Sequence, residues 1–177
     1  MDGNILARFE FFADIDPASR DAIAEMAELR EFAPGTIVFR DGDPADAIFG
    51  LLEGNVDLSL LFRDRILKTD EIRYEEAIRA RFVETETPVV FKEVHDGQIF
   101  GWSALAGLEK RTATARTVDA ARAFAIPAAA LRRRMSEDPI LGFRLMDRLS
   151  RIIAGRLHEL SGQMVEAWVE AFGAGRI

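Results

Sequence analysis

FGWSALAGLEKRTATA, residues 100–115, is the stretch of this chain that decides its fold. Gly101 has no Cβ, so the backbone can approach a ligand closely there. The small residues that follow are expected to open a short helix whose free N–H groups face an anion. Those N–H groups belong to Ser103, Ala104 and Leu105. Arg111 would add a fixed fork of donors that suits a phosphate. The spacing therefore predicts a binding site, not a catalytic centre.

Composition narrows the class of protein. With 177 residues, 49% of them hydrophobic, the chain is long enough for one domain with a real core and too short for two. A net charge of -7 argues against nucleic-acid binding, which needs a basic face. The absence of cysteine excludes disulfides, Cys-ligated zinc, iron–sulfur clusters and thiol nucleophiles. The start, MDGNILARFEFF, lacks an apolar run long enough for a signal peptide or a membrane span, and we predict a cytoplasmic protein.

Residues 1–33 are predicted to form an N-terminal helical segment. Apolar residues recur at helical spacing between Ile5 and Glu31, and Asp16 followed by Pro17 is typical of a helix start. The turn pair Pro34–Gly35 ends this pattern.

Residues 34–127 have the pattern of a β domain. Short apolar runs alternate with turn residues, from TIVF at 36–39 through AIFGLL at 47–52 to VDLSLL at 56–61. Further strands are expected at 88–94, 99–100, 112–118 and 122–126. Short strands joined by tight turns favour an antiparallel sandwich or jelly roll over a parallel sheet.

Within the β domain, the charged segment 62–87 is an insertion. The spacing of its apolar residues does not decide between a helix and a strand. A rough helical stripe runs from Ile66 to Phe82, whereas Ile72–Tyr74 and Arg81–Thr87 would fit an extended hairpin. We interpret the segment as a solvated excursion between two strands. The alternative is an insertion that binds a protein partner.

Residues 128–177 are predicted to be helical, with a short helix at Ala128–Met135 and a long one from Asp138–Pro139 to about Phe172. One apolar stripe follows the long helix at steps of three and four residues. It consists of Met146, Leu149, Ile153, Leu157, Leu160, Met164 and Trp168. Such a helix, roughly 45 Å long, would outreach a domain of this size. We therefore favour pairing with the same helix of a second copy, as a homodimer, over packing on its own β domain.

The glycine spacing at Gly35, Gly42 and Gly54, the stretch 100–115 and the trailing helices together resemble the cyclic nucleotide-binding domain family, over residues 11–160. The resemblance implies a mainly β fold, an antiparallel eight-stranded jelly roll with N-terminal helices and a long C-terminal helix. It identifies 100–115 as a phosphate-binding cassette for cyclic AMP or cyclic GMP. The ligand-binding residues that it implies are Phe100, Gly101, Trp102, Ser103, Ala104, Leu105, Arg111, Thr112, Ala113 and Thr114.

Two cassette residues each have a second interpretation. In the family the cassette arginine pairs with the cyclic phosphate, and Arg111 matches it; alternatively, Arg111 is a structural residue paired with an acid such as Glu109. Trp102 stands where the family has an acid that binds the ribose 2′-hydroxyl. Because tryptophan has a donor but no acceptor, the lost contact would cost about 1.5–3 kcal/mol. Trp102 would instead stack on a purine or another ligand, or simply pack at the cassette edge.

These features predict a cyclic nucleotide-binding regulatory or sensor module without chemistry of its own, in which ligand binding shifts the helices after Pro127. The alternative is a scaffolding module that has kept the fold and lost the ligand. Trp102 in the cassette favours this alternative, because it stands in place of the ribose-binding acid. A cupin-like metal enzyme is a third hypothesis.

Metal and DNA binding are both predicted to be absent. His95 and His158 are far apart in the sequence, with no acid cluster beside them, so they do not indicate a metal site. Transcription factors of the family carry a helix-turn-helix domain after the long helix, and the chain reaches Ile177 without room for one. We therefore expect no direct DNA binding.

Overall fold

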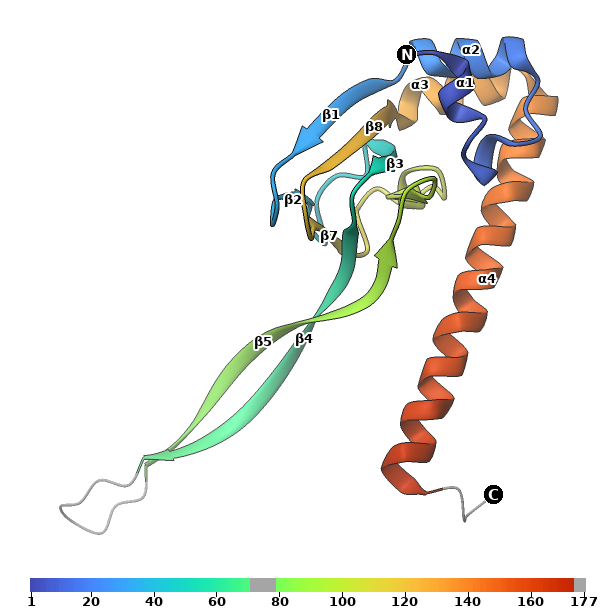
Figure 1. Ribbon diagram of the computed structural model, residues 1–177. Coiled ribbons are helices and arrows are strands. Elements are labelled where there is room, and N and C mark those ends of the chain that lie inside the picture. Colours follow the sequence, from blue (N-terminus) through green and yellow to red (C-terminus); the bar gives the residue numbers. More distant parts are fainter. Residues whose placement is uncertain (71–78, 174–177) are drawn as a thin grey trace.

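The computed structural model describes residues 1–70 and 79–173, and side chains outside 63–85. Within these residues eight antiparallel strands form two four-stranded sheets, ordered β1-β8-β3-β6 and β2-β7-β4-β5 (Figure 1). The strands are β1 (Glu28–Phe32), β2 (Ile37–Phe39), β3 (Ala47–Glu53), β4 (Val56–Asp70), β5 (Arg79–Val94), β6 (Ile99–Phe100), β7 (Thr114–Thr117) and β8 (Ala121–Pro127). The predicted jelly roll is confirmed.

The N-terminal segment differs from the single helical stretch predicted to reach Glu31. It contains α1 (Gly3–Leu6), the 3-10 turn η1 (Glu10–Phe12) and α2 (Pro17–Glu25). The predicted cap is confirmed, since the Asp16 carboxylate accepts from the Ser19 N–H at 3.0 Å. The helical prediction for residues 28–31 is wrong, because β1 there pairs with β8, placing Glu28 opposite Ala125. Sheet pairing with a distant strand overrides the local helical pattern.

The ambiguous segment 62–87 is extended where the structure describes it. β4 and β5 pair from Val56 opposite Val94 to Asp70 opposite Arg79. Figure 1 shows this hairpin projecting well beyond the rest of the β domain. The helical alternative is therefore wrong for 62–70 and 79–87, while the part around Ile72–Tyr74 lies outside the described residues.

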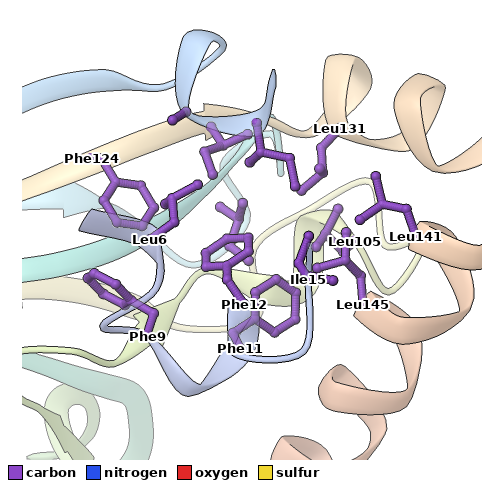
Figure 2. Close-up of a cluster of buried hydrophobic side chains, with 14 of the residues drawn as sticks. Leu6, Phe9, Phe11, Phe12, Ile15, Leu105, Phe124, Leu131, Leu141 and Leu145 are labelled. Carbon is purple, nitrogen blue, oxygen red and sulfur yellow. The ribbon is translucent and has the colours of Figure 1, made fainter. Parts of the chain in front are cut away.

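Strands β3 and β8 are buried on both faces, which is why their sequences show no clean alternation. Phe124 and Ile126 of β8 pack against the helices, whereas Ala123 and Ala125 face the second sheet. The Phe124 ring leaves no room beside Gly50, where a Cβ would lie 2.1 Å from it. Figure 2 shows Phe124 in the cluster that joins the β domain to the helices. That cluster includes Leu6, Phe9, Phe11, Phe12, Ile15, Leu105, Leu131, Leu141 and Leu145.

The C-terminal helices are α3 (Ala128–Glu137) and α4 (Pro139–Phe172), in close agreement with the prediction. The first part of α4 packs on its own domain through Leu141, Leu145 and Leu149, which are fully or almost fully buried. Farther along the helix Leu157 is 65% exposed and Met164 73% exposed. The predicted single stripe is therefore divided: its Leu149 lies in the core, and its Leu157, Met164 and Trp168 face outward.

Candidate functional site

A cavity of about 420 Å³ lies between the cassette and helix α4. The cassette supplies part of its wall, through residues on both sides of the cassette turn. These are Gly101, Trp102, Ser103, Thr112 and Ala113. Apolar side chains from the strands, including Phe39, Leu58 and Phe91, line it further. Helix α4 covers it with residues between Arg151 and Leu160.

The cassette turn depends on Gly101. This residue has φ 70° in the left-handed region, which side chains with a Cβ rarely adopt. A Cβ there would lie 2.8 Å from Arg111 Nη1 and 3.2 Å from atoms of the Phe39 and Phe49 rings. The strand β6 can therefore turn into the 3-10 helix η2 (Trp102–Ala104) only with glycine at this position.

The prediction of three free N–H groups at the helix start is wrong for two of them. The Ala104 N–H donates to the Gly101 carbonyl at 3.3 Å, and the Leu105 N–H donates to the Trp102 carbonyl at 2.9 Å. The tight i→i+3 pattern of a 3-10 turn consumes these donors within the cassette itself. Ser103 contributes to the cavity wall, although most of its surface is buried.

Arg111 is held by protein atoms next to the cassette and is only 2% exposed. Its Nη1 donates to the Gly101 carbonyl at 2.8 Å, and its Nη2 pairs with the Asp46 carboxylate at 3.1 Å. The guanidinium also stacks over the Phe39 ring, 4.3 Å from the ring centroid. Burial lowers the pKa of Arg111, and the carboxylates of Asp46 and Asp43 oppose that effect. The acidic partner is Asp46, not the suggested Glu109.

The buried Arg111 Nε has no hydrogen-bond partner among the described residues. The guanidinium itself does not line the cavity; the Phe39 ring, over which it stacks, does. Arg111 thus combines a structural role with one unused donor close to the cavity wall.

The other predicted site residues fall into three groups. Phe100, Ala104 and Leu105 are buried in the core, so they shape the cassette from behind. The Thr114 hydroxyl accepts from the Asp41 N–H at 3.1 Å and is not part of the cavity lining. Thr112 and Ala113 line the cavity, together with Gly101, Trp102 and Ser103.

A charged network joins α4 to the base of the hairpin at the edge of the cavity. Arg156 donates to the Phe91 carbonyl and to the Glu159 carboxylate, the latter at 2.7 Å. Lys92 reaches the same carboxylate at 3.5 Å. The hydrogen bond from Arg156, with the charge of Lys92, lowers the pKa of Glu159. The Arg156–Glu159 pair lies within α4, so the helix is fastened to the hairpin base by the hydrogen bond from Arg156 to the Phe91 carbonyl and by the Lys92–Glu159 ion pair.

The contribution of α4 and of the hairpin base to the site was not predicted from the sequence. The cavity-lining residues outside the prediction include Phe39, Phe91, Lys92, Arg151, Ile152, Gly155, Arg156 and Glu159. A glycine and two arginines inside the long helix were the available signals, at Gly155, Arg151 and Arg156. Trp168 is not among the cavity-lining residues, and its ring contacts that of Phe172 in a tilted arrangement, with 5.6 Å between the ring centroids.

Two features are absent from the described part of the chain. His, Cys, Asp and Glu side chains nowhere gather there in a group of three or more that could hold a metal ion. Among the same residues, no helix has the combination of length and apolar character needed to cross a membrane.

The architecture matches known structures closely. A crystal structure entitled “Putative Cyclic nucleotide-binding protein” from Geobacter metallireducens is 26% identical and superposes with a TM-score of 0.68, covering 89% of this chain and 99% of that one. The chain has the cyclic nucleotide-binding domain fold. The regulatory domain of Toxoplasma gondii PKA, crystallised with cAMP, shares this fold with 18% identity and a TM-score of 0.64, covering 88% of this chain and 49% of that one.

Sequence comparison adds a weaker likeness. A protein named “Putative potassium channel protein” from Rhodopseudomonas palustris is 24% identical over 153 residues, which is 86% of this chain. The chain spans 31% of the length of that curated relative. No protein-family model matches the chain.

Proposed function

We propose that this chain is a regulatory module that binds a cyclic nucleotide of the cAMP or cGMP kind between its cassette and α4. The observation that carries the proposal is the cavity itself, because residues on both sides of the cassette turn line one space with the helix. Its volume of about 420 Å³ falls within the usual range for small-molecule sites, roughly 300–1,000 Å³. The module performs no chemistry of its own.

In this mode the phosphate lies against the cassette. Ser103 and Thr112 offer hydroxyls in the cavity wall, and the Nε of Arg111 is a donor without a partner. The Gly101 carbonyl holds Nη1 and the Asp46 carboxylate holds Nη2, so Arg111 reaches the phosphate through Nε or by sharing or leaving that carboxylate. Trp102 cannot accept the ribose hydroxyl hydrogen bond, which reduces affinity by about 10 to 150-fold.

The signal passes through α4. The helix covers the cavity and is fastened to the hairpin base where Arg156 meets the Phe91 carbonyl and Glu159 meets Lys92. A ligand that fits one position of the helix better than another therefore shifts the equilibrium between those positions. The outward apolar residues of α4, among them Leu157, Met164 and Trp168, form the surface through which two copies pair. A protein partner at 62–87 remains a separate prediction.

The second candidate is a structural module that binds no small ligand. Two observations favour it: Trp102 replaces the acid, and Arg111 is already paired with Asp46 and Gly101. In this case the cassette is retained for packing alone.

Calorimetric titration with cyclic AMP and cyclic GMP distinguishes the two. Arg111→Met is the informative variant, because an apolar side chain of similar length preserves the packing against Phe39 better than alanine does. Its melting temperature is measured alongside, as the control for folding. Saturable binding to the native chain, lost in a folded Arg111→Met variant, supports the sensor.

Trp102→Glu restores an acceptor at the ribose position and provides the second arm. Tighter binding by this variant, or binding that only this variant shows, means that the cassette has kept its shape. If only the Trp102→Glu variant binds, the native chain takes another ligand or none. A native chain and a folded Trp102→Glu variant that both fail to bind support the structural module.

A further inference from the structure

Gly155 occupies an unusual place in α4. A glycine inside a helix costs about 1 kcal/mol relative to alanine. In the same helix Gly142 has a packing reason, since a Cβ there would lie 2.8 Å from the Met135 carbonyl oxygen of α3. A Cβ at Gly155 would meet nothing within 4 Å. Neighbouring protein atoms therefore do not require glycine at this position.

What distinguishes Gly155 is the cavity, which it lines from the side of the helix. Gly162 also has open space around it, but it lies outside the cavity lining. Seven residues separate the two glycines, almost two full turns, so they lie on nearly the same side of α4. The two positions thus share one helical environment and differ in whether a ligand space lies beneath them.

We propose that Gly155 sets the size of the site, leaving room for a planar aromatic ring between α4 and the cassette. The proposal rests on the proposed function and deepens it, since the ring of a cyclic nucleotide would be its base. The walls around this space favour a flat apolar group: Phe39, Phe91 and Trp102 provide aromatic surface, and Ile152 and Leu160 flank the glycine on the helix.

Enlarging residue 155 is expected to fill this space without disturbing the fold. Gly155→Ala adds one methyl group in open space and keeps binding, whereas Gly155→Leu projects an isobutyl group into the cavity. We expect Gly155→Leu to weaken ligand binding by at least about tenfold. Gly162→Leu is the matched control, because it gives α4 the same gain in helix propensity away from the cavity. Both leucine variants should melt at or above the native temperature.

The experiment titrates the native chain and the three variants with cyclic AMP by calorimetry, and with the aromatic anion anilinonaphthalene sulfonate by fluorescence. If the native chain binds cyclic AMP, two results together support the proposal. Gly155→Leu loses this binding, and Gly162→Leu keeps an affinity within about twofold of the native value. Equal cyclic AMP affinity in the native chain and a folded Gly155→Leu variant overturns it and leaves the proposed function standing.

If the native chain does not bind cyclic AMP, the same titrations are made with cyclic GMP. If it binds neither nucleotide, the proposed function fails, and the dye arm tests the space on its own. The exposed outer surface of α4 is common to all variants, so only the difference between the two leucine variants reports on the cavity. Dye binding that is reduced in Gly155→Leu but not in Gly162→Leu supports a site for another aromatic ligand. Equal dye binding in both overturns the proposal.

Discussion

At the scale of single residues, Arg111 and Trp102 define what the cassette can do. Arg111 is anchored by the Gly101 carbonyl, the Asp46 carboxylate and the Phe39 ring, so its removal affects packing as well as any phosphate contact. Trp102 both lines the cavity and packs against the helical core cluster. A substitution at either position therefore needs a stability measurement beside the binding measurement.

The environment of Asp57 in β4 predicts how the stability of the fold depends on pH. Partial burial and the nearby Glu93 carboxylate, its cross-strand partner, raise the pKa of Asp57; Arg116 lies opposite it on β7. A carboxyl whose pKa is raised in the folded state contributes stability that is complete below its unfolded pKa and is lost as pH rises through the folded pKa.

Asp57→Asn should therefore stabilise the protein at neutral pH, by less than about 1 kcal/mol because the group is only partly buried. This gain in the free energy of unfolding should shrink toward zero as the pH falls below 3.8, the ordinary pKa of an aspartate carboxyl. Urea unfolding at several pH values measures it. Glu93→Gln, which removes the repelling charge, should give a smaller change in the same direction. A gain independent of pH would contradict this assignment.

At the scale of elements, α4 has two parts with different environments. Leu149 is completely buried against the domain, whereas Leu157, a little over two turns farther along, is 65% exposed. The first part belongs to the core of this chain. The second covers the cavity on one side and presents apolar side chains to solvent on the other.

Alanine substitution should separate these two parts. Leu149→Ala is expected to lower the free energy of unfolding by about 2–5 kcal/mol, because it leaves a cavity in the core. Leu157→Ala should change it by less than about 0.5 kcal/mol when measured at protein concentrations too low for pairing. Denaturant unfolding followed by circular dichroism tests both. Similar losses in the two variants would show that the outer part of α4 is also packed within one chain.

At the scale of the whole molecule, Figure 1 shows two long projections from one compact body, the β4–β5 hairpin and the far part of α4. Among the described side chains, the two projections meet near the body, where Lys92 pairs with Glu159 and Arg156 reaches the Phe91 carbonyl. The cavity lies at that junction. In the proposed function, a ligand bound there would therefore change how α4 is presented to a second copy.

The proposed homodimer gives the third prediction. Leu157→Glu combined with Met164→Glu should convert a dimer to a monomer, because each adds a charge to an exposed apolar surface that pairing would bury. Sedimentation equilibrium measures the molecular mass directly. Gln163→Glu is the control: it lies four residues beyond Glu159, on the cavity side of α4, and should leave the dimer intact. A native chain that sediments as a monomer at all concentrations would contradict the proposal.

The sequence by itself determined the local features of this protein. The turn at Gly101, the cap at Asp16 and the helices from Ala128 onward follow from interactions among near neighbours, so short motifs predict them. The strand pattern with its tight turns favoured an antiparallel sandwich or jelly roll, and the family resemblance implied the jelly roll. Even there, β1 was missed because its pairing with β8 joins residues far apart in the chain.

Only the tertiary structure decided how the site is enclosed. Asp46 pairs with Arg111 across 65 positions of sequence, and α4 brings Gly155 and Arg156 over a cassette that lies some fifty residues earlier. Neither contact has a local signature, because each depends on how the helices pack against the sheets. The division of α4 into a buried and an exposed part has the same cause: its apolar stripe is continuous in sequence, but the domain that covers it ends partway along the helix.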